Sequence, residues 1–258
     1  MLRTLAMLSV CAGLLAADAG LWTPTAGYVR DSAGKLRPVY GMGANFVAGE
    51  AVAGRVLAAA FSDGWGVAKA DDQLLVFDRE AGLVSSSSAP GGPAILALTD
   101  RGAPAAAFFP ESGELLGWRG GRWHPVAAPP GVIDGPVLAV TGTRLGMLRL
   151  AVRRGDLVWR VDMSAATGRV LGETVLPGAG SPMMLTPAGK CLYVDEGELV
   201  IRDERGAETR VTLPVAVDRM APMGDGWIHL DAGPGCAGAA LDLGGGKPRI
   251  YRLPEARR

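Results

Sequence analysis

The apolar residues of this chain occur in short runs of about four to six, and each run begins or ends at a turn that contains glycine or aspartate. Three of these runs follow nearly the same turn, whose glycines are Gly113, Gly155 and Gly197. The same interval of 42 residues therefore occurs twice. A self-similar period of this length is typical of architectures in which each repeat is one small sheet.

Two further series of turns have the same period. One series follows the runs described above and introduces another strand six times, beginning with the turn Asp31–Gly34. The other series precedes those runs five times, and its copies include Asp63-Gly64 and Asp225-Gly226, where we expect the left-handed backbone of a tight hairpin. The unit is therefore four strands joined by three turns in about 40 residues.

This pattern predicts an all-β chain folded as a β-propeller, whose blades have strands A to D from the centre outwards. Six blades are favoured, because five units carry four strands and the segment from Leu21 to about Ala51 supplies the C-to-D hairpin of a reduced N-terminal blade. A five-bladed ring with an extra hairpin is the alternative. A β-sandwich also has closely spaced strands, but it would not need three turn series of one period.

With these repeats, the chain resembles the exported bacterial β-propellers that include the YVTN, NHL and PQQ-like repeat groups. The resemblance covers nearly the whole chain after its leader, and it concerns architecture. The sequence lacks a Trp-Asp dipeptide closing each repeat, a double glycine in each blade and the tryptophan docking motif of quinone-dependent dehydrogenases. The resemblance therefore implies a propeller and assigns no functional residues.

The N-terminus has the pattern of a secretory signal peptide. A basic residue, Arg3, precedes the apolar run from Leu5 to Ala17, and Ala17-Asp18-Ala19 forms a small-x-small cleavage site. We expect residues 1–19 to be removed and residues 20–258 to form a single propeller domain, exported to the periplasm or the cell exterior. An anchor is the alternative, but the apolar run is too short to span a bilayer. An oxidising compartment would allow Cys191 and Cys236 to pair, and their pairing is left open.

Charge is balanced, with 26 Lys and Arg against 26 Asp and Glu. No global field would attract nucleic acid or anionic lipid, so neither is expected as a partner. No apolar stretch long enough for a membrane span follows the leader. We expect a monomer without a cofactor.

Candidate binding residues lie in the predicted B-to-C turns, which share one face of a propeller with the D-to-A connections. They are charged residues that could form a polar rim for a ligand: Asp71, Asp72, Glu111, Arg153, Arg154, Asp195, Glu196 and Asp231. Solvated turns are charged in most proteins, so a structural explanation stands beside the functional one.

No catalytic residue and no metal site are predicted. His124 and His229 have no second histidine or cysteine at ligand spacing, and Asp195–Glu198 lacks the alternating pattern of a calcium loop. We expect the tryptophans at the repeated turns and strands to wedge between neighbouring sheets; as the alternative they bind sugar on one face. They are Trp65, Trp118, Trp123, Trp159 and Trp227.

The sequence therefore favours an exported, non-catalytic propeller that binds a protein, peptide or glycan partner. The alternative is a hydrolase or lyase with carboxylates around the central channel. The two differ in one structural requirement, because an enzyme needs acid, base and orienting groups within a few ångströms in a pocket.

Overall fold

The described part of the protein consists of β-strands joined by turns and loops. The computed structural model describes residues 25–41, 45–143, 145–224, 226–233 and 236–254, and none of these residues is helical. The predicted signal peptide, residues 1–19, lies outside these ranges.

The strands follow one another in six groups. The first group has three strands, β1 (Thr25–Arg30), β2 (Leu36–Tyr40) and β3 (Val47–Ala48). The next two groups are β4 (Val56–Phe61), β5 (Trp65–Ala70), β6 (Gln73–Asp78) and β7 (Leu83–Ser88), then β8 (Ile95–Leu98), β9 (Pro104–Phe109), β10 (Glu114–Arg119) and β11 (Arg122–Pro125). The fourth group is β12 (Val137–Gly142), β13 (Met147–Arg154), β14 (Leu157–Ser164) and β15 (Val170–Leu176). The last two are β16 (Met183–Leu185), β17 (Cys191–Asp195), β18 (Glu198–Arg202) and β19 (Glu208–Thr212), then β20 (Arg219–Gly224), β21 (Trp227–Asp231), β22 (Ala239–Asp242) and β23 (Arg249–Arg252).

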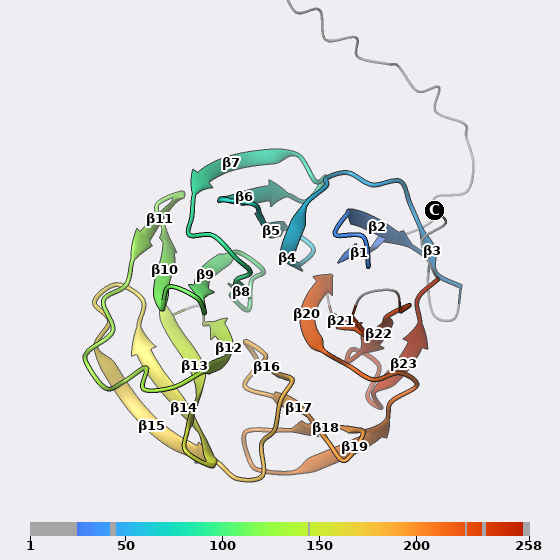
Figure 1. The fold of residues 1–258 in the computed structure, drawn as a ribbon. Coiled ribbons are helices and arrows are strands. Elements are labelled where there is room, and N and C mark those ends of the chain that lie inside the picture. The colour runs from blue at the N-terminus through green and yellow to red at the C-terminus, as the bar shows by residue number, and fades with distance from the viewer. Residues whose placement is uncertain (1–24, 42–44, 144, 225, 234–235, 255–258) are drawn as a thin grey trace, which may run out of the picture.

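The groups lie in a ring, with the first strand of each group nearest the centre (Figure 1). Consecutive strands within a group pair antiparallel, which confirms the predicted all-β propeller arrangement. The sheets by themselves do not give the blade number. The first has three strands, and the pair Met223↔Phe61 joins β20 to β4 in parallel, which merges the second and sixth groups into one eight-stranded sheet.

The predicted turns between second and third strands are confirmed. Gly113, Gly155 and Gly197 lie in the connections β9–β10, β13–β14 and β17–β18, with φ of 70°, 58° and 81°. Glycine reaches this left-handed region without the steric cost that a Cβ would impose. The five predicted hairpins between first and second strands are also present as antiparallel pairs.

The expectation of a left-handed turn is wrong at Gly64, whose φ is not positive, whereas Gly226 has φ 69°. A serine organises the first of these turns instead. The hydroxyl of Ser62 accepts hydrogen bonds from the backbone N–H groups of Gly64 and Trp65, at 3.4 and 3.2 Å, and lies 3.0 Å from the carbonyl of Gly102. Side-chain hydrogen bonding of this kind stabilises a turn without a left-handed residue. Asp225 lies outside the described residues.

The placement of the first hairpin as C-to-D is also wrong. Its turn, 31–35, lies beside the start of β4, since the N–H of Val56 donates to the carbonyl of Gly34 at 2.8 Å. In the four-stranded groups, the turn at that end joins the second and third strands. β1 therefore runs antiparallel to β4 and β20, as a second strand does. The sequence suggested otherwise because the Asp31 carboxylate accepts backbone N–H groups two and four residues ahead, as Asp78 and Asp203 do in true C-to-D turns.

The core of the described residues consists of six hydrophobic clusters, each between two neighbouring groups of strands. Two of them hold the short first group in place. Val29 and Val39 pack with Met223 of β20, while Leu36 packs on the other side with Phe61 of β4. The other four clusters lie between successive four-stranded groups from β4 to β23.

The predicted tryptophan wedges are present only in part. All five side chains are half-buried, and two of them pack against core clusters, Trp123 beside Phe109 and Trp227 beside Phe46. Trp159 instead lies under the guanidinium of Arg154, 5.6 Å from the ring centre.

The two cysteines of the described residues are free thiols and form no disulfide. Cys236 is exposed, whereas Cys191 is buried. Burial raises the pKa of the Cys191 thiol to about 11, so it stays protonated and unreactive at neutral pH.

Candidate ligand site in the central channel

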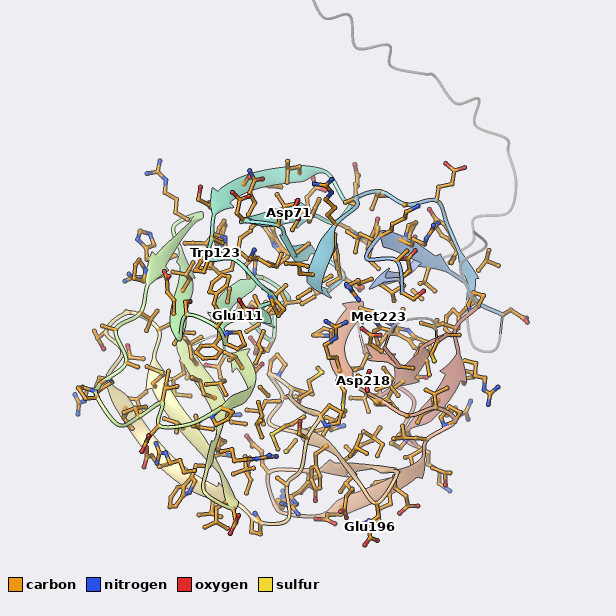
Figure 2. The ribbon with its side chains drawn as sticks, viewed as in Figure 1. Asp71, Glu111, Trp123, Glu196, Asp218 and Met223 are labelled. Carbon is orange, nitrogen blue, oxygen red and sulfur yellow. The ribbon has the colours of Figure 1, made fainter. Side chains whose placement is uncertain are left out.

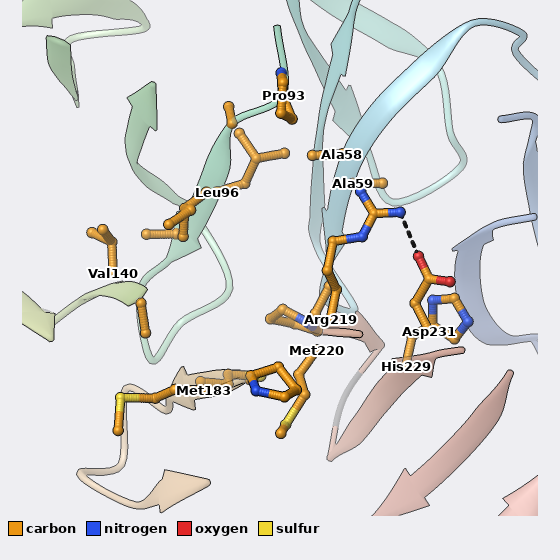
Figure 3. Close-up of a pocket in the computed structure, with 18 of the residues that line it drawn as sticks. Ala58, Ala59, Pro93, Leu96, Val140, Met183, Arg219, Met220, His229 and Asp231 are labelled. Carbon is orange, nitrogen blue, oxygen red and sulfur yellow. Dashed lines mark hydrogen bonds and ion pairs between the residues drawn. The ribbon is translucent and has the colours of Figure 1, made fainter. Parts of the chain in front are cut away.

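A cavity of about 310 Å³ occupies the centre of the ring. Its walls come from β1, from the first strand of each of the other five groups and from β21, together with the loops that lead into the innermost strands. Most of the lining is apolar, and Figure 3 shows Leu96, Val140, Met183 and Met220 facing it from four different strands. The volume lies at the lower end of the range for small-molecule and peptide side-chain sites.

One wall of the cavity is polar. The Nη2 of Arg219 donates a hydrogen bond to Asp231 Oδ2 at 2.7 Å, drawn as the dashed line in Figure 3, and its Nη1 donates to the carbonyl of Leu57 at 3.3 Å. On the other side, the Nε of Arg30 donates to the carbonyl of Val56 at 2.6 Å. The Nη1 of Arg30 lies 3.8 Å from the same oxygen of Asp231. Two guanidinium groups therefore share one carboxylate.

The position of this wall follows from the short first group. Val56 and Leu57 are the first residues of β4. The short first group has no innermost strand parallel to β4 and β20, so no such strand lies beside the carbonyls of Val56 and Leu57. Buried backbone carbonyls need hydrogen-bond donors, and the two arginines supply them. Arg219 is 46% exposed and Arg30 is 23% exposed, so both remain accessible from the cavity.

His229 lies behind this wall and is 8% exposed. Burial is the main cause that lowers the pKa of His229 to about 4; the charge of Asp231 opposes this shift, and the charges of Arg219 and Arg30 contribute to it. The imidazole is therefore neutral at ordinary pH. His124, in contrast, lies half-buried on the outermost strand β11.

The predicted rim residues are spread around the ring, and only Asp231 lines the cavity. Figure 2 shows Asp71 and Glu196 on opposite sides of the molecule. Several of the predicted residues are held by neighbours on their own strand group: Asp71 lies near Arg55 (3.7 Å), Arg154 forms two hydrogen bonds with Glu173, and Asp195 pairs with Arg210 (2.9 Å). Of the remaining ones, Asp72, Glu111 and Glu196 lie at turns and Arg153 lies near the end of β13; none of these four lines the cavity. The structure therefore does not bring the eight residues together at one site.

Sequence reasoning missed Arg30 and Arg219. A signal for Arg219 was available, because the pair Met223↔Phe61 places Arg219 at the repeat position that Leu57 holds in β4. Arg219 is charged at a position where the other copy, Leu57, is apolar, and such a difference marks a departure from the repeat. Arg30 carried no such signal, since the first hairpin was placed in the wrong position.

The described residues contain no group of three or more His, Cys, Asp or Glu side chains that could hold a metal ion. None of the described segments is a helix with the length and apolarity needed to cross a bilayer.

No protein-family model matches the sequence, and no curated protein is similar to it in sequence. Among solved structures, one chain of a nidogen/laminin complex is similar at 12% identity and a TM-score of 0.54, over 88% of this chain and 92% of that one. The structure of U3-55K is similar at 13% identity and a TM-score of 0.50, over 77% and 64% of the two chains. A streptogramin B lyase structure gives 15% identity and a TM-score of 0.46, over 78% and 69%. Likeness at such low identity shows the fold alone, so the predicted resemblance to β-propeller repeat proteins is confirmed without a specific family.

Proposed function

We propose that the chain is an exported, non-catalytic binding propeller whose site is the mouth of the central cavity. One observation carries this proposal. The cavity has apolar walls and a single polar edge, where Asp231 is already held by Arg219. A concave, largely apolar site with a few convergent polar groups suits binding and orientation of a partner. A peptide or protein partner fits this lining better than a glycan, whose hydroxyls need many hydrogen-bonding side chains.

We also infer a ring of six blades, the first of which has three strands. The inference is supported by the six core clusters, because the β1–β3 sheet packs against β4 on one side and against β20 on the other. In a five-bladed ring with an extra hairpin, that hairpin would contact the ring on one side only.

The enzymatic alternative, a hydrolase or lyase, requires an acid and a base that can exchange protons with a substrate. Asp231 and Asp218 are the carboxylates of the described cavity lining. Asp231 accepts a hydrogen bond from Arg219, and Asp218 is exposed, with its carboxylate beside Gly233. His229 is neutral and buried. This arrangement favours a structural ion pair over an acid–base pair.

A peptide-display selection on the immobilised mature protein tests this function. We expect enriched peptides that bind the wild type and fail to bind Ala221→Trp, because Ala221 lines the cavity and belongs to none of the core clusters. Ala166→Trp, at an exposed turn, is the matched control and should bind like the wild type. Equal binding to both variants would place the site elsewhere, and recovery of cleaved peptide by mass spectrometry would favour the enzyme.

A further inference from the structure

We infer that the cavity recognises the free C-terminal end of a partner polypeptide, with the terminal carboxylate on Arg219 and Arg30 and an apolar last side chain in the cavity. This inference rests on the proposed function and narrows it to one chemical feature of the partner. It follows from the charge at the polar wall, the lining of the cavity and the strand edges around it.

At the polar wall two guanidinium groups approach one carboxylate, while Asp218, the other carboxylate of the described lining, lies beside Gly233. Asp231 is the one carboxylate between two guanidiniums, and its Oδ2 is the atom that both of them approach. Burial and then the charge of Arg219 lower the pKa of Arg30, while Asp231 and Asp31 oppose that shift. The Nε–H of Arg219 makes no hydrogen bond with the described residues. A carboxylate from a ligand would therefore meet two guanidinium groups that share one partner, and an available donor on Arg219.

The rest of the cavity favours an apolar group beside that carboxylate. Met183 and Met220 lie on β16 and β20, which are neighbours in the ring, and Leu96 and Val140 lie on β8 and β12 (Figure 3). Methionine side chains adapt to differently shaped apolar partners. The lining therefore fits one aliphatic or aromatic side chain without demanding a single residue type.

The strand edges favour a polypeptide as the ligand that carries the carboxylate and the apolar side chain. β8, β12 and β16 are each the terminal strand of their sheet, and residues of all three line the cavity. A terminal strand has one edge of backbone N–H and C=O groups without a strand partner, and such an edge pairs well with the main chain of a peptide. An aliphatic carboxylic acid has no main-chain N–H and C=O groups that could pair with such an edge.

Fluorescence anisotropy with defined peptides tests the inference. The probes are fluorescein-labelled hexapeptides of Gly and Ser, each ending in one apolar residue, prepared as the free acid and as the C-terminal amide. We expect at least one free acid to bind about tenfold or more tighter than its amide, as expected for a charged hydrogen bond. Arg219→Gln should abolish that preference. Arg210→Gln is the matched control, because Arg210 is 43% exposed and also pairs with a carboxylate, but lies on β19 far from the cavity.

Each outcome separates the inference from the function on which it rests. Equal binding of acid and amide, both lost in Ala221→Trp, would overturn C-terminal recognition and leave channel binding intact. Binding unaffected by Ala221→Trp would place the peptide site outside the cavity and overturn both proposals. No binding by any probe would overturn C-terminal recognition, and the display selection would still test the proposed function. Octanoate has a carboxylate and an apolar chain but no peptide backbone. If it competes as well as the best peptide acid, the inference that the ligand is a polypeptide is overturned. If Arg219→Gln unfolds, Arg30→Gln replaces it, and an unchanged preference for the acid in the folded variant counts against the inference.

Discussion

Lowering the pH from 7 to 4.5 should destabilise the fold through His229. The unfolded pKa is about 6.5 and the folded pKa is about 4. The folded state favours the neutral imidazole of His229. The stability that this preference contributes is therefore complete above pH 6.5 and is lost as the pH falls towards 4. The difference between the two pKa values corresponds to about 3 kcal/mol in total, of which about 2 kcal/mol is lost by pH 4.5.

Urea unfolding at pH 7 and pH 4.5 measures this loss. Carboxylates also titrate in this interval, so the quantity of interest is the difference between the wild type and His229→Gln. We expect the variant to lose about 2 kcal/mol less than the wild type. His124→Gln, which removes a half-buried histidine from β11, is the control and should behave like the wild type. The same loss of stability in all three proteins would refute the reasoning.

A second measurement addresses the cause of the shift. In Arg219→Gln, NMR titration should give a higher pKa for His229, because the charge of Arg219 helps to hold that pKa down. A lower pKa in this variant would contradict the role of Arg219, and a wild-type value near 6.5 would show that the imidazole is solvated.

Three glycine substitutions test the closure of the ring and the corrected turns. Gly27→Ala should lower stability by more than about 2 kcal/mol in thermal or urea unfolding, because φ is 146° and an added Cβ would lie 1.5 Å from the carbonyl oxygen of Met223; unchanged melting would contradict the contact between β1 and β20. Gly226→Ala should lower stability by about 1 kcal/mol because Gly226 has a left-handed φ, whereas Gly64→Ala should be neutral or slightly stabilising. Equal effects of the two substitutions would indicate that both turns have the same backbone conformation, as the sequence suggested.

Local features of the fold were predictable because the residues that make them are contiguous. The turn glycines Gly113, Gly155 and Gly197 have no alternative that reaches left-handed backbone so easily, and their spacing revealed the repeat. The hairpin at Gly64 was recognised with the wrong backbone conformation, because the hydroxyl of Ser62 accomplishes what a left-handed glycine would. The conformation of each turn depends on a few consecutive residues, and the repeat appears when such turns are compared along the chain.

The candidate site was not predictable in the same way. The charged turns stood out in the sequence because charge recurs there, yet most of those side chains lie far apart around the ring. Arg30 and Asp231 are separated by almost the whole chain and meet only where the first and last groups of strands become neighbours. No local pattern encodes that meeting.

The sequence by itself determined the repeated unit, the number of first-to-second hairpins and the conformation of most turns, because these follow from spacing and backbone preference. The tertiary structure decided how the ring closes. The aspartate turn at Asp31 is the same local motif as the turns at Asp78 and Asp203, yet it lies at the opposite end of the ring. Packing of β1 between β4 and β20 sets that orientation, and it also brings two arginines and one carboxylate to the wall of the cavity. A turn motif specifies its own hydrogen bonds and carries no information about the strands that it will face.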